Sequence, residues 1–174
     1  MSARTAPAVV LTGFMGAGKS TVGRAVAERL GVRFLDTDAE LERSTGRTIA
    51  SIFTEDGEAA FRELELATVT RVLADFDGVV ALGGGSVTVP AIRAALTGGP
   101  VVHLRITAEN GFRRVEGSDR PLLAGPEPRD TYAQLLAERA ELYETVAAVT
   151  VDADQPVDTV VDAILTALRK DNES

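Results

Sequence analysis

Residues 13–20 read Gly13-Phe14-Met15-Gly16-Ala17-Gly18-Lys19-Ser20, and this stretch determines which folds the chain can adopt. It matches the pattern G-x-x-x-x-G-K-[ST], a phosphate-binding loop, at every fixed position. An apolar run, Ala8 to Thr12, precedes the loop, and a helical pattern from Ser20 to Leu30 follows it. A strand before the loop and a helix after it distinguish such a loop from a chance glycine-rich turn. The sequence therefore predicts a nucleotide site.

Each part of this loop has a physical role in holding a nucleotide. Glycines allow backbone conformations that other residues avoid, so N–H groups can point inward and form a nest for anions. We expect the backbone of Gly16, Ala17 and Gly18 to bind phosphate, helped by the positive end of the following helix. Lys19 is expected to reach the β- and γ-phosphates, Ser20 to offer its hydroxyl to Mg²⁺, and Thr21 to help hold the α-phosphate.

Composition limits the class of protein. The 174 residues, 45% of them hydrophobic, predict a single globular domain over residues 1–174. The chain has no cysteine, which excludes disulfides and thiolate metal sites and suits a reducing cytoplasm. The net charge of -8 disfavours nucleic-acid binding. No apolar run is long enough for a membrane helix, and Met1 to Pro7 is expected to be a short flexible tail. We expect a cytoplasmic monomer.

Short apolar runs alternate with helical patterns, which predicts an α/β fold with a parallel sheet. After Ala8–Thr12, strands are expected at residues 33–36, 78–82, 100–104 and 148–151, and helices around residues 61–73, 90–96 and 157–168. The stretch from Gly111 to Arg129 is rich in glycine, proline and arginine and predicts little regular structure. It is either a solvated surface loop or a mobile lid, at about 111–128, whose arginines meet phosphate on closure. The phosphate-binding loop favours the lid.

The rest of the chain indicates which nucleotide enzyme this is. A GTPase would carry an N-K-x-D segment for guanine, and the sequence has none. A motor ATPase would usually need a longer chain. What remains is a small phosphoryl-transfer enzyme, which requires a second substrate site.

Asp36-Thr37-Asp38 ends the second expected strand, where ligands bind in open α/β sheets. One carboxylate there can hold Mg²⁺ through its water shell, and the other can accept a proton from an acceptor hydroxyl. Alternatively, Asp36 or Asp38 caps a helix over residues 39–43. The motif alone leaves both interpretations open.

Other candidates for the second site have ordinary explanations as well. Arg62 has Glu58 four residues before it and Glu65 three after it, which either orients the guanidinium toward a substrate carboxylate or forms a surface ion pair. Gly83-Gly84-Gly85 follows the third strand and either exposes backbone to a ligand or forms a loose turn. Arg139 alone is a helix-surface arginine. The only histidine, His103, is interpreted as a core or strand-end residue.

Taken together, these residues resemble the shikimate kinase family over nearly the whole chain. The resemblance rests on the phosphate-binding loop and five further segments: Leu35-Asp36-Thr37-Asp38, Gly57-Glu58 with Phe61-Arg62 and Glu65, Leu82-Gly83-Gly84-Gly85, Arg120-Pro121-Leu122-Leu123, and Arg139 with Leu142-Tyr143. It implies a three-layer α/β/α P-loop fold with a five-stranded parallel sheet of order 2-3-1-4-5. It also implies transfer of the ATP γ-phosphate to the 3-hydroxyl of shikimate, on the route to chorismate and the aromatic amino acids.

The resemblance assigns roles to individual residues. Asp38 binds shikimate hydroxyls and acts as the base, and Lys19 and Arg120 assist transfer. Arg62 and Arg139 clamp the carboxylate, beside the backbone of Gly83, Gly84 and Gly85. Asp36 and Ser20 support Mg²⁺, and Arg120 is the lid arginine that reaches the phosphates. On the adenine side the candidates are Gln155 and either Arg113 or Arg114, with Arg114 taken as the nucleotide-binding residue. Two other functions stay open: a kinase for another sugar acid such as gluconate, and a nucleotide-binding regulator without turnover.

Overall fold

A computed structural model describes residues 6–118 and 120–173. Of the predicted tail, Met1 to Thr5 therefore lie outside the described residues. The five expected strands form one parallel sheet: β1 (Val9–Thr12), β2 (Phe34–Asp36), β3 (Val79–Ala81), β4 (Val101–Arg105) and β5 (Val149–Asp152). The order β2-β3-β1-β4-β5 confirms the predicted topology. Within these ranges, no helix is both long and apolar enough to cross a bilayer.

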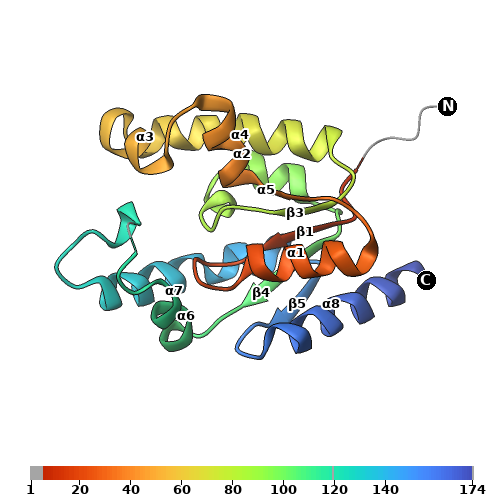
Figure 1. Cartoon of the computed structure of the whole chain (residues 1–174). Coiled ribbons are helices and arrows are strands. Elements are labelled where there is room, and N and C mark those ends of the chain that lie inside the picture. The colour runs from red at the N-terminus through yellow and green to blue at the C-terminus, as the bar shows by residue number, and fades with distance from the viewer. Residues whose placement is uncertain (1–5, 119, 174) are drawn as a thin grey trace.

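Helices cover both faces of the sheet, as Figure 1 shows. α1 (Lys19–Leu30) and α8 (Val157–Asn172) pack on one face, and α4 (Glu58–Asp75), α5 (Pro90–Leu96) and α7 (Pro128–Val146) pack on the other. Side chains alternate along each strand, so Val9 and Leu11 of β1 belong to the first core and Val10 to the second. Since both faces are covered, the strands read as nearly continuous apolar runs.

Two short helices lie between β2 and α4, of which the sequence offered the first only as the alternative helix over residues 39–43 and did not predict the second. They are α2 (Thr37–Thr45) and α3 (Ile49–Asp56), which lie with α4 at one edge of the molecule (Figure 1). Their boundaries were present in the sequence as caps. Gly46 ends α2 in the left-handed conformation, and Thr48 accepts a hydrogen bond from the Ser51 N–H at the start of α3.

The prediction of little regular structure over residues 111–128 was wrong at both ends. α6 (Ala108–Val115) includes the first part of this stretch, and α7 begins at Pro128. The Thr107 side chain caps the start of α6. Gly111, inside this helix, allows Tyr132 to pack closely against it, since a Cβ at Gly111 would lie on the Tyr132 hydroxyl. Only residues 116–127 connect the two helices, and they include the short 3₁₀ helix η2 (Pro121–Leu123). A second 3₁₀ helix, η1 (Ser86–Thr88), follows the three glycines.

Candidate active site

The phosphate-binding loop joins β1 to α1, and its glycines are used as the motif requires. Gly16 and Gly18 have φ angles of 90° and 91°, in the left-handed region that favours glycine. Gly18 is the N-cap of α1 and offers no side chain to cap it. The first N–H groups of α1 are therefore directed to the mouth of the loop, where an anion can accept from them.

Lys19 is folded back onto the loop. Its Nζ donates to the carbonyl oxygens of Gly13 at 2.6 Å and Phe14 at 3.0 Å. Burial lowers the pKa of Lys19 to about 8, with Asp38 acting in the opposite direction and Arg120 in the same one. A nearby phosphate would favour the charged form, so the ammonium is suited to accompany a bound anion.

Asp36 caps a helix with one carboxylate oxygen and faces Ser20 with the other. Its Oδ1 accepts from the backbone N–H of Asp38 at 2.9 Å and of Ala39 at 3.1 Å, which makes it the N-cap of α2. Its Oδ2 accepts from the Ser20 hydroxyl at 2.5 Å. A hydroxyl and a carboxylate oxygen beside a phosphate nest are the hard oxygen donors that Mg²⁺ prefers.

Asp38 projects from the first turn of α2 over the end of β3. It lies so close to Gly83 that a Cβ there would stand 2.6 Å from its Oδ1. Burial, followed by the charges of Glu65 and Asp36, raises the pKa of Asp38 to about 6. A carboxyl with a pKa near neutrality is a better proton acceptor than an exposed aspartate.

Arg62 is fixed by carboxylates of its own helix. Its guanidinium donates to Glu65 at 2.8 Å and, more loosely, to Glu58 at 3.3 Å. Glu65 is buried, and its second oxygen accepts from Ser86 at 2.9 Å. The Arg62 side chain is 15% exposed, so it is not the surface ion pair of the alternative interpretation. Its Nε is buried without a partner among the described residues.

The three glycines after β3 each make room for a different neighbour. A Cβ at Gly83 would meet Asp38, one at Gly84 would stand 3.1 Å from the Met15 nitrogen, and one at Gly85 would meet the Arg62 guanidinium. The Gly83 N–H also donates to the Thr37 hydroxyl oxygen at 3.2 Å. The loop is therefore closely packed rather than loose.

Arg139 comes from α7, and it is 7% exposed, unlike a helix-surface arginine. Its guanidinium lies 5.5 Å from the centre of the Phe14 ring. A small cavity of about 90 Å³ brings it together with the other residues expected to bind the acceptor, namely Asp38, Arg62, Gly83, Gly84 and Gly85. The lid arginine, Arg120, lines the same cavity. A larger cavity of about 330 Å³ shares Asp38, Gly83, Gly84 and Arg120 with it and continues to Gly16, Gly18, Lys19, Ser20, Thr21, Asp36 and Arg114.

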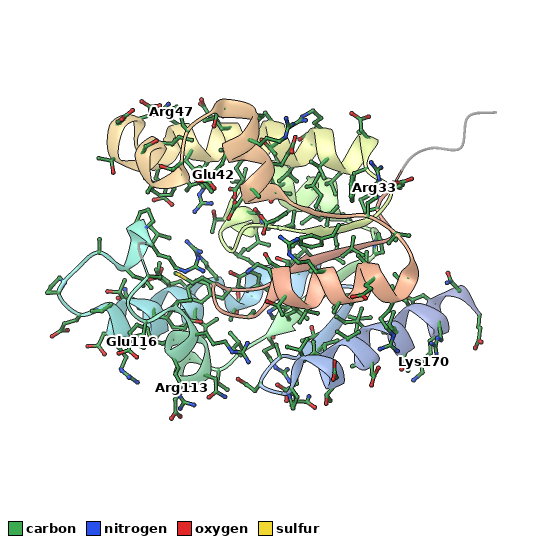
Figure 2. The ribbon with its side chains drawn as sticks, in the orientation of Figure 1. Arg33, Glu42, Arg47, Arg113, Glu116 and Lys170 are labelled. Atoms are coloured by element: carbon green, nitrogen blue, oxygen red, sulfur yellow. The ribbon has the colours of Figure 1, made fainter. Side chains whose placement is uncertain are left out.

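A third cavity, of about 250 Å³, lies on the other side of the phosphate-binding loop. Ala17, Gly18, Thr21, Arg114 and Gln155 are among its lining residues. Arg114 donates to the carbonyls of Gly16 at 3.0 Å and Ala153 at 3.3 Å. Its neighbour Arg113 points away from the molecule on the outer side of α6 (Figure 2). The geometry therefore favours Arg114 over Arg113 for contact with a nucleotide.

Sequence reasoning missed Tyr132 and gave Tyr143 no role beyond the family resemblance. Tyr132 donates its hydroxyl to the Met15 carbonyl at 2.6 Å, and Tyr143 donates to the Gly84 carbonyl at 2.5 Å. The spacing of these residues could have indicated their role, because positions 132, 139 and 143 lie on one face of a helix and Arg139 was already a candidate site residue. His103 is buried and stacks on Tyr143 with ring centroids 5.0 Å apart, which confirms that it is a core residue.

Known proteins resemble this chain in both sequence and fold. Residues 15–169 match the family model described as Shikimate kinase. This chain belongs to the shikimate kinase family. A shikimate kinase from Mycobacterium tuberculosis is 53% identical over 151 residues, which cover 86% of each chain. A solved shikimate kinase from Acinetobacter baumannii, in complex with shikimate, has a TM-score of 0.89 and 37% identity and covers 97% of this chain and 94% of its own.

A gluconokinase structure from Sinorhizobium meliloti is a more distant neighbour of this shikimate kinase family member. Its TM-score is 0.58 at 25% identity, over 97% of this chain and 94% of its own. The likeness to it shows the shared architecture, while the likeness to shikimate kinases extends further in both sequence and structure.

Proposed function

We propose that this protein transfers the γ-phosphate of ATP to the 3-hydroxyl of shikimate, giving shikimate 3-phosphate and ADP. The observation that carries the proposal is that Asp38, Arg62 and Arg139 line one cavity. Gly84 lines this cavity and also the larger one that contains the phosphate-binding loop, so the two cavities adjoin. Shikimate has one carboxylate and three hydroxyls. Two guanidinium groups, one carboxylate and a glycine-rich backbone complement that set of groups.

The acceptor would be held by its carboxylate between Arg62 and Arg139. Glu65 and Glu58 already orient the Arg62 guanidinium, so little side-chain freedom remains to be lost on binding. Planar guanidinium groups bind carboxylates through two parallel hydrogen bonds. This geometry would fix the orientation of the shikimate ring and also contribute to the affinity for shikimate. Gly84 is the most accessible of the three glycines and is suited to a backbone contact with a hydroxyl.

Asp38 would accept a hydrogen bond from the reacting hydroxyl and take its proton late in the transfer. With a pKa of about 6, its carboxyl is ionised at neutral pH and still basic enough to receive a proton. Most of the rate enhancement comes from holding the hydroxyl in line with the γ-phosphate and from neutralising charge.

The nucleotide would bind through the amides of Gly16, Ala17 and Gly18, with Lys19 leaving its carbonyl partners to reach the phosphates. Ser20 and Asp36 are the oxygen donors that fit Mg²⁺, with water and phosphate oxygens supplying the other ligands. When bound, Mg²⁺ neutralises charge on the β- and γ-phosphates. Arg114 and Gln155 would flank the nucleoside, since both line the adjoining cavity.

The connection between α6 and α7, residues 116–127, would act as the lid. Its Arg120 is exposed and lines both cavities between which the phosphate moves. Closure would bring that charge onto the γ-phosphate and keep water from competing with the acceptor. We also propose one domain that works as a cytoplasmic monomer, which size-exclusion chromatography with light scattering and cell fractionation would test.

The test is ADP formation with shikimate or gluconate as the acceptor. We expect ADP to form only when shikimate is present, and the product to carry phosphate at the 3-hydroxyl by NMR. Turnover of gluconate but not of shikimate would overturn the proposal. Tight ATP binding with no transfer to either acceptor would indicate a regulator instead.

A further inference from the structure

The chain has two tyrosines, and both lie on α7 with fully buried side chains. Each donates its hydroxyl to a backbone carbonyl of a different ligand loop. Tyr132 donates to the Met15 carbonyl in the phosphate-binding loop at 2.6 Å. Tyr143 donates at 2.5 Å to the Gly84 carbonyl in the loop of Gly83, Gly84 and Gly85, called the acceptor loop from here on. One rigid helix therefore holds both loops, with Arg139 between the two tyrosines on the same face.

Ring contacts fix the tyrosines themselves. The Tyr132 ring lies 4.7 Å from that of Phe14 and 5.8 Å from that of Phe112, while Tyr143 stacks on His103. Burial raises the pKa of Tyr132 to about 12 and that of Tyr143 further, so both remain donors at neutral pH. Among the described residues, no other donor reaches the carbonyls of Met15 or Gly84.

The two loops are in direct contact at this point. A Cβ on Gly84 would stand only 3.1 Å from the Met15 nitrogen, so no side chain separates the two backbones. Any loosening of either loop changes the distance between a bound triphosphate and a bound hydroxyl. A misplacement of about 1 Å can cost on the order of 100-fold in rate.

We infer that Tyr132 and Tyr143 are positioning residues: through their hydroxyls, α7 sets the spacing between the phosphate-binding loop and the acceptor loop, and hence the alignment of the transfer. The inference rests on the proposed function. Neither tyrosine needs to touch a substrate. Each acts on the loop whose carbonyl it holds, so the two residues should affect different substrates.

The experiment replaces each tyrosine with phenylalanine, which keeps the ring and removes the hydroxyl. We expect Tyr132→Phe to raise KM for ATP about 5-fold and Tyr143→Phe to raise KM for shikimate about 5-fold, as for one lost hydrogen bond. Each variant should leave the other KM within about 2-fold, and each should lower kcat about 10-fold because alignment suffers in both. Thr145→Val is the matched control, since it removes a hydroxyl that bonds the Glu141 carbonyl on the exposed side of α7.

Assays run well below each variant's Tm, by circular dichroism, separate positioning from stability. A merely structural role would lower Tm and leave kcat and both KM values within 2-fold, which would overturn the inference. So would both KM values rising together in each variant. If the wild type fails to phosphorylate shikimate, the proposed function is wrong, but ATP affinity still decides: Tyr132→Phe should weaken it and Tyr143→Phe should not. If Tyr143→Phe does not fold, Tyr132→Phe decides alone.

Discussion

The two halves of the active site are built from different parts of the polypeptide. The phosphate half is contiguous, because residues 13–21 supply the backbone amides, the ammonium of Lys19 and the hydroxyl of Ser20. The acceptor half is assembled from side chains on three helices, with Asp38 on α2, Arg62 on α4 and Arg139 on α7. In the proposed function, backbone geometry recognises phosphate, whereas side chains distant in sequence select the acceptor. Substitutions in the acceptor half should therefore separate the two substrates.

The largest expected effect is that of Asp38→Asn. An amide keeps the size of the side chain but cannot accept the proton, so kcat should fall about 1000-fold, within the range for a general base. ATP binding should stay within about 2-fold, because the backbone amides of residues 16–18 and the start of α1 supply most of the phosphate contacts. Steady-state kinetics and ATP titration calorimetry measure the two quantities.

Asp77→Asn is the control for Asp38→Asn, because Asp77 is an exposed aspartate paired with Arg33 far from the site. It should leave both quantities unchanged. Substantial turnover by Asp38→Asn would remove this residue from the mechanism, and a parallel loss of ATP binding would mean that the two halves are not independent.

Arg62→Ala comes next. It would remove one arm of the proposed carboxylate clamp, so we expect KM for shikimate to rise about 100-fold, the size seen when one partner of a buried charge pair is removed. KM for ATP should change less than 3-fold. Arg71→Ala is the matched control on the same helix, since Arg71 is exposed and pairs with Glu40. Equal losses for both substrates would make Arg62 a structural residue.

The contrast between the halves also explains what the sequence could predict. Strand order and the phosphate-binding loop depend on local patterns, because apolar runs and a fixed motif carry them. α2 was offered only as an alternative over residues 39–43, and α3 was missed because it is short, although Gly46 and Thr48 marked the end of one helix and the start of the other. α6 was missed because Gly111 and two neighbouring arginines resemble the composition of a loop. The packing of Tyr132 against Gly111 explains why a glycine stands inside this helix.

The acceptor half was predictable only with the help of family resemblance. Nothing local in the sequence separates Arg139 from a helix-surface arginine, and its burial results from the placement of α7 against Phe14. Asp36 illustrates a different limit. A capping role and a role in holding Mg²⁺ were alternatives in the sequence, but one carboxylate oxygen caps α2 and the other faces Ser20, so the cap does not exclude the proposed metal role.

Each half should control one limb of the pH profile. Asp38, with its pKa raised to about 6, must be ionised to accept a proton, so kcat/KM for shikimate should fall about tenfold per pH unit below 6. Lys19, with its pKa lowered to about 8, must be protonated to hold phosphate, so kcat/KM for ATP should fall above 8. An acid limb that is absent down to pH 5 would contradict the assignment of Asp38.

Within the phosphate half, two adjacent arginines on α6 provide a smaller test. Arg114→Ala should raise KM for ATP about 5- to 10-fold, as expected for one charge-assisted hydrogen bond, since Arg114 lines the nucleotide side of the loop. Arg113→Ala should change nothing, because that side chain is 69% exposed and pairs with Glu109. KM for shikimate should be constant in both. If Arg113→Ala has the larger effect, the nucleotide lies elsewhere on α6.

The last expected effect concerns stability rather than activity and arises at His103 in β4. Burial, with Arg105 and Lys19 adding to it, lowers the pKa of His103 to about 4, while its unfolded value is about 6.5. Between these values the unfolded chain binds the proton more strongly, so the stabilisation is complete above pH 6.5 and is lost as the pH falls toward 4. Asp38 acts in the opposite direction, because its raised pKa favours the folded state as the pH falls from 6. The change of wild-type Tm with pH therefore contains the contributions of both His103 and Asp38.

His103→Phe keeps a ring against Tyr143 and removes the titration of the imidazole. Between pH 7 and 5, the Tm of this variant should therefore fall by about 5 °C less than that of the wild type, corresponding to about 2 kcal/mol. Parallel Tm curves for the two proteins would mean that His103 titrates normally in the folded state.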